Sequence, residues 1–108
     1  MGILGGKVSF VEMRTYDLKI GTANAYASMY REEGYAIQKS HLGEPVGYYV
    51  SEVGDLNQII HMWRYESLEQ RAEKRTALFD DPAWLGYAAK IGPMIIRQRN
   101  AILHEVLD

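Results

Sequence analysis

Hydrophobic residues recur along the chain with two different spacings, which predict strands in some segments and helices in others. Residues 7–18, 46–53, 58–65 and about 94–104 are rich in β-branched and aromatic residues, and we expect a strand in each. The second and third of these segments are separated by a short turn at Gly54-Asp55, which predicts an antiparallel hairpin.

Two helical segments alternate with the expected strands. Apolar and polar positions recur at helical spacing at Tyr26, Met29, Tyr30, Glu33 and Ile37, and Gly34 predicts a bend or a break in that helix. A second helix is expected to start after Ser67, because Ser67 and Gln70 form a capping-box pattern, and to run to about Phe79. Asp81-Pro82 then predicts a new helix start, with core residues that include Trp84 and Tyr87.

The resulting order, β-α-β-β-α-β, predicts a ferredoxin-like α+β fold, in which helices cover one face of a four-stranded antiparallel sheet. The chain has 108 residues, so a single domain is expected, and we assign it to residues 7–108. Residues 1–6 contain three glycines and are expected to be a flexible leader or a remnant of cloning.

The two faces of the sheet are assigned from the first and third strands, which are neighbours in this topology. The helix-covered face is expected to carry Val11, Met13, Ile60 and Met62. The open face is expected to carry Glu12, Arg14, Tyr16, His61, Trp63 and Tyr65. Because so many aromatic residues would make a large exposed patch, we expect a homodimer in which two sheets pack face to face as a dimeric α+β barrel.

This expected open face is also the best candidate for a small-molecule site, since aromatic walls with a few converging polar groups are typical of ligand pockets. His61 is a candidate general base near neutral pH, with its tautomer fixed by a Glu or Tyr side chain. Arg14, beside Glu12, is placed to bind an anion or a developing oxyanion. Tyr16, Trp63 and Tyr65 are the expected aromatic walls. A phenol or quinol would be a suitable substrate for oxidation without a cofactor.

The same residues are compatible with a purely structural role. Tyr, Trp, Arg and paired polar groups are common in dimer interfaces, where His61 would be a satisfied structural residue. Glu12 and Arg14 would then form a buried interface salt bridge. An alternative hypothesis is therefore a non-enzymatic structural or protein-interaction module whose polar and aromatic face serves dimerisation. A third hypothesis is a metal or haem binder.

Composition argues against several other classes of protein. The net charge is −2 and there is no run of basic residues, which argues against nucleic-acid binding. The chain has no cysteine, and its three histidines are scattered, so we expect no metal site and no cofactor. There is no apolar run of about 20 residues for a membrane span and no secretory signal pattern, so a cytoplasmic location is expected.

Several segments resemble the NIPSNAP family, over about residues 8–102. They are VEMRTYDLKIG, QKSHLG, GYYVSEVGDLNQIIHMWRYESLEQR and DDPAW. The most specific feature is the combination of E-x-R-x-Y, starting at Glu12, with H-x-W-x-Y, starting at His61. The positions that look like the family pattern are Glu12, Arg14, Tyr16, His41, Gly47, Tyr48, Glu52, Asn57, His61, Trp63 and Tyr65.

The resemblance implies a ferredoxin-like domain that pairs into a dimeric barrel, here of the short, single-domain bacterial type. Eukaryotic members are longer and are associated with mitochondria and vesicles. The wider superfamily includes cofactor-independent monooxygenases and small isomerases or decarboxylating enzymes. Our hypothesis is a pocket at the open sheet face for a small aromatic or anionic molecule. Its catalytic candidates are His61, Arg14 and Glu12, and its ligand-binding candidates are Tyr16, Tyr48, Trp63 and Tyr65. Whether the protein is an enzyme stays open.

Overall fold

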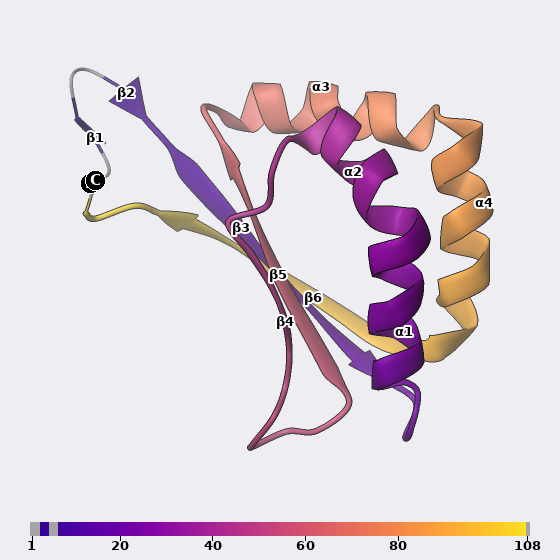
Figure 1. Cartoon of the computed structure of the whole chain (residues 1–108). Helices are drawn as coiled ribbons and strands as arrows, with labels where there is room; N and C mark the ends of the chain where they lie inside the picture. The colour runs from indigo at the N-terminus through magenta and orange to yellow at the C-terminus, as the bar shows by residue number, and fades with distance from the viewer. Residues whose placement is uncertain (1–2, 5–6, 108) are drawn as a thin grey trace.

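The main sheet has four antiparallel strands in the order β4-β5-β3-β6 (Figure 1). The computed structural model describes residues 3–4 and 7–107. The strands are β3 (Phe10–Leu18), β4 (Gly47–Val50), β5 (Gln58–Tyr65) and β6 (Ile95–His104). They confirm the predicted fold, although β4 is shorter than expected. A small hairpin of β1 (Ile3–Leu4) and β2 (Lys7–Val8) precedes the sheet. Of the expected leader, residues 1, 2, 5 and 6 lie outside the described residues.

The first helical segment continues through Gly34 instead of breaking there. It consists of α1 (Ala23–Met29), a π-helical turn η1 (Tyr30–Gly34) and α2 (Tyr35–Leu42). Gly34 has helical backbone angles, so the reason for glycine is space. A Cβ atom at this position would lie 2.5 Å from Cζ of Tyr87, which means that the absence of a side chain lets α4 approach closely.

The second helical segment is divided as predicted into α3 (Leu68–Phe79) and α4 (Pro82–Ile91), and a 3-10 turn, η2 (Gly92–Met94), leads into β6. The hydroxyl of Ser67 accepts a hydrogen bond from the backbone N–H of Gln70 at 3.0 Å, which confirms the predicted cap. The Gln70 side chain accepts from the backbone N–H of Glu66 at 2.9 Å. Asp81 caps α4 by accepting from the backbone N–H of Ala83 at 2.9 Å.

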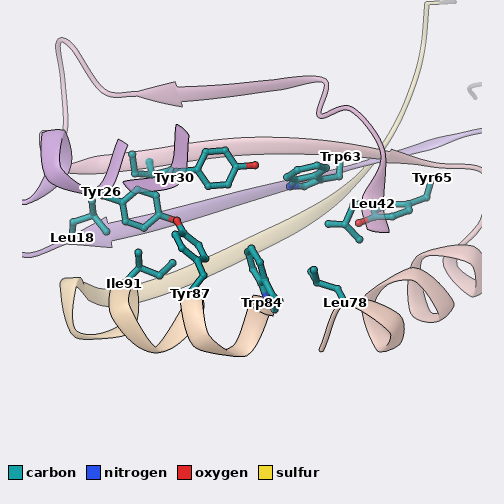
Figure 2. Packing of buried hydrophobic residues seen from close by; sticks show 11 residues of the cluster. Leu18, Tyr26, Tyr30, Leu42, Trp63, Tyr65, Leu78, Trp84, Tyr87 and Ile91 are labelled. Atoms are coloured by element: carbon teal, nitrogen blue, oxygen red, sulfur yellow. The ribbon is translucent and has the colours of Figure 1, made fainter. Parts of the chain in front are cut away.

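The helices cover one face of the sheet, and the core lies between the two layers (Figure 1). In Figure 2, Trp63 and Tyr65 lie on the sheet side of this core, while Leu78, Trp84 and Tyr87 approach from the helices. The predicted assignment of the two faces is therefore wrong. Glu12, Arg14, Tyr16, His61, Trp63 and Tyr65 lie under the helices, because the helices supply aromatic rings and polar partners for them.

The open face of the sheet carries the other alternating set of side chains. Strand alternation and register place these residues there: Val11, Met13, Thr15, Gly47, Tyr49, Ile60, Met62, Ala101 and Leu103. Tyr49 crosses the position of Gly47 so closely that a Cβ atom there would collide with its ring. The same register places Arg64 beside Val11 and Arg99 beside Thr15 on this face. The face is therefore apolar around Met13, Ile60 and Met62 and carries charge on either side of them. In the described part of the chain, none of the helices has the length and apolar character needed to span a membrane.

Candidate functional site

A cavity of about 150 Å³ lies between the sheet and the helices. The strands contribute Arg14, Tyr16 and His61 to its wall, and the helical layer contributes Arg75 and Trp84. The prediction of a pocket at the open sheet face is wrong, since these side chains lie under the helices. The strand register explains how they meet, because Arg14 of β3 pairs with His61 of β5.

His61 is fully buried and forms a hydrogen bond with the indole of Trp63. The Trp63 Nε1–H donates to Nδ1 of His61 at 2.6 Å, whereas the prediction assigned this role to a Glu or Tyr side chain. The Nε2 atom has no partner among the described residues. Burial and then the nearby charge of Arg14 lower the pKa of His61 to about 3, so the ring is neutral at physiological pH. This environment places His61 as a hydrogen-bond donor and gives no support to a base that titrates near neutral pH.

Two tyrosine rings pack against the imidazole. The ring of Tyr48 stacks on His61 at 4.6 Å between centroids, and Tyr16 meets it edge-on at 4.9 Å. The other contacts of Tyr48 hold it in place, since it stacks on Tyr30 at 3.9 Å and its hydroxyl lies 3.1 Å from that of Tyr26. The predicted wall residues Tyr16 and Tyr48 thus line the cavity, whereas Trp63 and Tyr65 belong to the core behind it.

Glu12 is the buried centre of a charge cluster beside the cavity. Its Oε2 accepts hydrogen bonds from Arg14 at 3.1 Å, Arg71 at 2.7 Å and Asn100 at 2.9 Å. Burial opposes ionisation, but these hydrogen bonds and the two positive charges outweigh it and lower the Glu12 pKa to about 2. The predicted pairing of Glu12 with Arg14 is confirmed, but it lies under the helices and not at the sheet's open face, and Glu12 does not line the cavity.

Sequence reasoning missed Arg75, which lines the cavity from α3. Its guanidinium is half-buried and lies 5.3 Å from the centre of the Phe79 ring. It makes no hydrogen bond or ion pair with any residue in the described ranges. Burial, and then the charge of Arg14, lower the pKa of this group. Residues 69–75 mix charges of both signs, which is typical of a solvated helix face, but Arg71, Arg75 and buried Leu78 recur at helical spacing, a signal that both arginines face the sheet.

The cluster as a whole carries an excess of positive charge. Within residues 7–107, Arg14, Arg71 and Arg75 surround a single carboxylate, that of Glu12. Buried charges in proteins are usually paired, so this surplus favours an anion in the adjacent cavity. Among the described residues, no group of three or more His, Cys, Asp or Glu side chains is arranged to hold a metal ion.

The sequence model of the NIPSNAP family matches residues 11–107, which is most of the chain. The chain belongs to the NIPSNAP family. A NipSnap homolog from Dictyostelium discoideum is 39% identical over 79 residues, which cover 73% of this chain and 34% of that protein. NipSnap homolog 2 from Danio rerio is 30% identical, over 85% of this chain and 32% of its own. The NIPSNAP chain thus spans about a third of the length of these curated relatives.

Solved structures of bacterial NIPSNAP proteins are similar over nearly the whole chain. A NIPSNAP family protein of unknown function from Agrobacterium tumefaciens is 44% identical, with a TM-score of 0.90, covering 97% of this chain and 94% of that one. A NIPSNAP-like domain protein from Burkholderia xenovorans is 43% identical, with a TM-score of 0.86, covering 88% and 83% of the two chains. A protein from Nitrosomonas europaea, provisionally assigned as an antibiotic biosynthesis monooxygenase, is 10% identical with a TM-score of 0.67, and shares the fold alone.

Proposed function

We propose that this NIPSNAP chain binds a small anionic molecule with a flat apolar body in the cavity beneath the helices. The observation that carries the proposal is Arg75, a half-buried guanidinium that lines the cavity, contacts the Phe79 ring, and has no hydrogen-bond or ion-pair partner in the part of the chain that the structure describes. An anionic group next to Arg75 and Arg14 would supply the missing negative charge. A guanidinium is well suited to this task because it binds a carboxylate with two parallel hydrogen bonds.

The other polar groups at the cavity support a hydrogen-bond acceptor as ligand. The Nε2–H of His61 and the Nε1–H of Trp84 are both donors, and neither has a partner among the described residues. A carboxylate can accept from all of these groups, whereas an ammonium ion would meet two guanidinium charges of its own sign. The cavity is therefore expected to prefer a carboxylate over an amine of the same shape.

The size of the cavity limits the rest of the ligand. An apolar cavity of about 150 Å³ in another protein accepts a molecule the size of benzene. Leu78, Trp84 and Ile91 give this cavity apolar walls of the same kind. Benzoate thus combines the charge and the size that the site fits, and we take it as the probe.

A catalytic role for His61 would require more than ligand binding. A neutral imidazole can donate a hydrogen bond to an oxyanion as it forms, as an isomerase or a cofactor-independent oxygenase requires. However, neither His61 nor Glu12 is placed to act as the base of such a reaction, since Nδ1 of His61 accepts from Trp63 and Glu12 is held by two arginines. We therefore propose ligand binding as the function.

Quenching of tryptophan fluorescence is a direct test, because Trp84 lines the cavity and the chain has only two tryptophans. Benzoate should bind more tightly than benzyl alcohol, and benzylamine should not bind. Arg75→Gln should weaken benzoate binding about tenfold or more, since a charged hydrogen bond is worth about 1.5–3 kcal/mol. Arg97→Gln, at an exposed position of β6, is the matched control and should change nothing. Equal affinity for benzoate and benzyl alcohol, or an unaffected Arg75→Gln variant, would refute the proposal.

We further propose that two copies of the chain associate through the open sheet faces. The apolar centre of this face, where Met13, Ile60 and Met62 are partly exposed beside buried Val11, supports such a contact because exposed apolar patches mark association sites. This homodimer differs from the one expected from the sequence, which used the polar and aromatic face. The helices cover the polar and aromatic face of the sheet. The alternative hypothesis of a non-enzymatic module that dimerises through this polar and aromatic face is therefore wrong.

A further inference from the structure

We propose that Trp63 is a positioning residue of the cavity, which holds His61 in the one tautomer that can donate a hydrogen bond from Nε2. The inference rests on the proposed function in that it assigns a role to the His61 side chain in ligand binding. Trp63 itself lies outside the cavity wall, so any effect of its indole N–H on a ligand passes through His61.

The assignment of the tautomer follows from the chemistry of the two rings. An indole N–H can only donate, so the Nδ1 atom that receives it at 2.6 Å must carry a lone pair. In a neutral imidazole the proton then resides on Nε2. The exposed fractions of Trp63 and His61 are 0% and 1%, so solvent does not compete for this hydrogen bond. Nothing else in the described ranges contacts Nδ1 or Nε2 through a hydrogen bond.

The surroundings of His61 keep the ring neutral. The titratable and charged groups that face it are Glu12, Arg14 and Tyr16 from β3, Tyr48 from β4, Tyr26 from α1 and Arg75 from α3. The two guanidinium groups and burial oppose a second proton, and only Glu12 favours one. Since Glu12 is already held by Arg14 and Arg71, the ring should stay neutral over the whole range in which a free histidine titrates.

The Nε2 atom of His61 is fully covered by the atoms around it. Tyr16 and Tyr48 are the two rings that pack against the imidazole. A ligand that accepts the hydrogen bond from Nε2 therefore requires a small movement of the side chains around the imidazole. The position of the proton thus decides whether this movement gains a hydrogen bond, because an unprotonated Nε2 would offer a carboxylate only a lone pair.

The test is nitrogen-15 NMR of the His61 ring in the native chain, in Trp63→Phe and in Trp84→Phe. The native protein should show a protonated Nε2 and an unprotonated Nδ1, and its benzoate affinity should be constant from about pH 5 to 8. Trp63→Phe should populate both tautomers and weaken benzoate binding in proportion to the lost competent form. Trp84→Phe makes the same change at the other tryptophan and should leave the tautomer of His61 unchanged.

Three results would overturn the inference: a native ring protonated on Nδ1, an unchanged single tautomer in Trp63→Phe, or benzoate binding that strengthens steeply as His61 titrates. The first can be measured on the native chain, so the inference is testable even if Trp63→Phe does not fold. Failure of the proposed function is distinguishable, because it would appear as no benzoate binding with a normal Nε2–H tautomer. In that case Trp63 would fix the ring without serving a ligand, and its role as a positioning residue for binding would be rejected as well.

Discussion

Glu12 shows how one buried residue connects stability with the candidate site. Its carboxylate is completely buried and binds Arg14 and Arg71, which belong to a strand and a helix. The cluster therefore ties α3 to the sheet at the edge of the cavity. Because only one carboxylate balances the arginines around it, its removal should affect both folding and the electrostatics of the site.

Glu12→Gln should lower the free energy of unfolding by about 3 kcal/mol near neutral pH, because two partly buried guanidinium groups lose their counter-ion. The pKa of Glu12 is lowered from 4.5 to about 2 in the folded state, so its contribution is present above the unfolded pKa and is lost as the pH falls toward 2. Urea unfolding near pH 7 and near pH 3 measures both effects, and the variant should be closer to the native protein at the lower pH.

Glu33→Gln is the matched control for this measurement. Glu33 pairs with Lys90 on the helix surface, where both side chains are partly exposed. Such a pair contributes about 0–1 kcal/mol, so the variant should be close to the native protein at both pH values. A Glu12→Gln variant that is no less stable than Glu33→Gln would contradict the structural role of the buried cluster.

At the scale of single elements, local patterns predicted most of what the structure contains. The limits of β5, the Ser67 cap and the restart at Pro82 all agree, because each depends on residues within a few positions of one another. The side of the sheet that the helices cover could not be read in this way. Both faces of β3 and β5 carry apolar residues, and the partner that allows Glu12 to be buried, Arg71, lies 59 positions away on α3.

Gly34 illustrates a close contact between elements that the sequence did not predict, since its pattern indicated only a bend or a break in the helix. Gly34→Ala would place a Cβ atom 2.5 Å from Tyr87 and 2.9 Å from Tyr30, both in aromatic rings. We expect a net loss of stability of about 1–2 kcal/mol, because overpacking outweighs the better helix propensity of alanine. Thermal unfolding should show a lower midpoint for this variant.

Gly86→Ala on α4 is the corresponding control. This glycine is exposed, and an added Cβ atom would meet nothing within 4 Å. The substitution should stabilise the protein by up to about 1 kcal/mol through helix propensity alone. If both alanine variants were stabilised, the close packing of η1 against α4 would not be a constraint on the fold.

At the scale of the whole molecule, the two faces of the sheet have different roles. The helix-covered face encloses the candidate site, and the open face is available for a second copy. Met13→Glu introduces a charge at the centre of this face, on a central strand, and should convert the proposed homodimer to a monomer that is still folded. Size-exclusion chromatography with light scattering measures the mass, and circular dichroism checks the fold.

Leu68→Glu is the control for the dimer, since Leu68 is an exposed apolar residue at the start of α3, on the opposite side of the sheet. It should remain a dimer, and the glutamate is tolerated at a helix N-terminus. A native chain that is monomeric at high concentration, or a Met13→Glu variant that stays dimeric, would count against the proposed interface.

The central claim is that a small anion binds beneath the helices next to Arg75. A crystal structure of the protein with benzoate tests it most directly. The account predicts benzoate in the cavity of about 150 Å³, with its carboxylate within hydrogen-bonding distance of the Arg75 guanidinium and its ring against Trp84. An empty cavity at saturating benzoate, or a carboxylate turned away from Arg75, would contradict it.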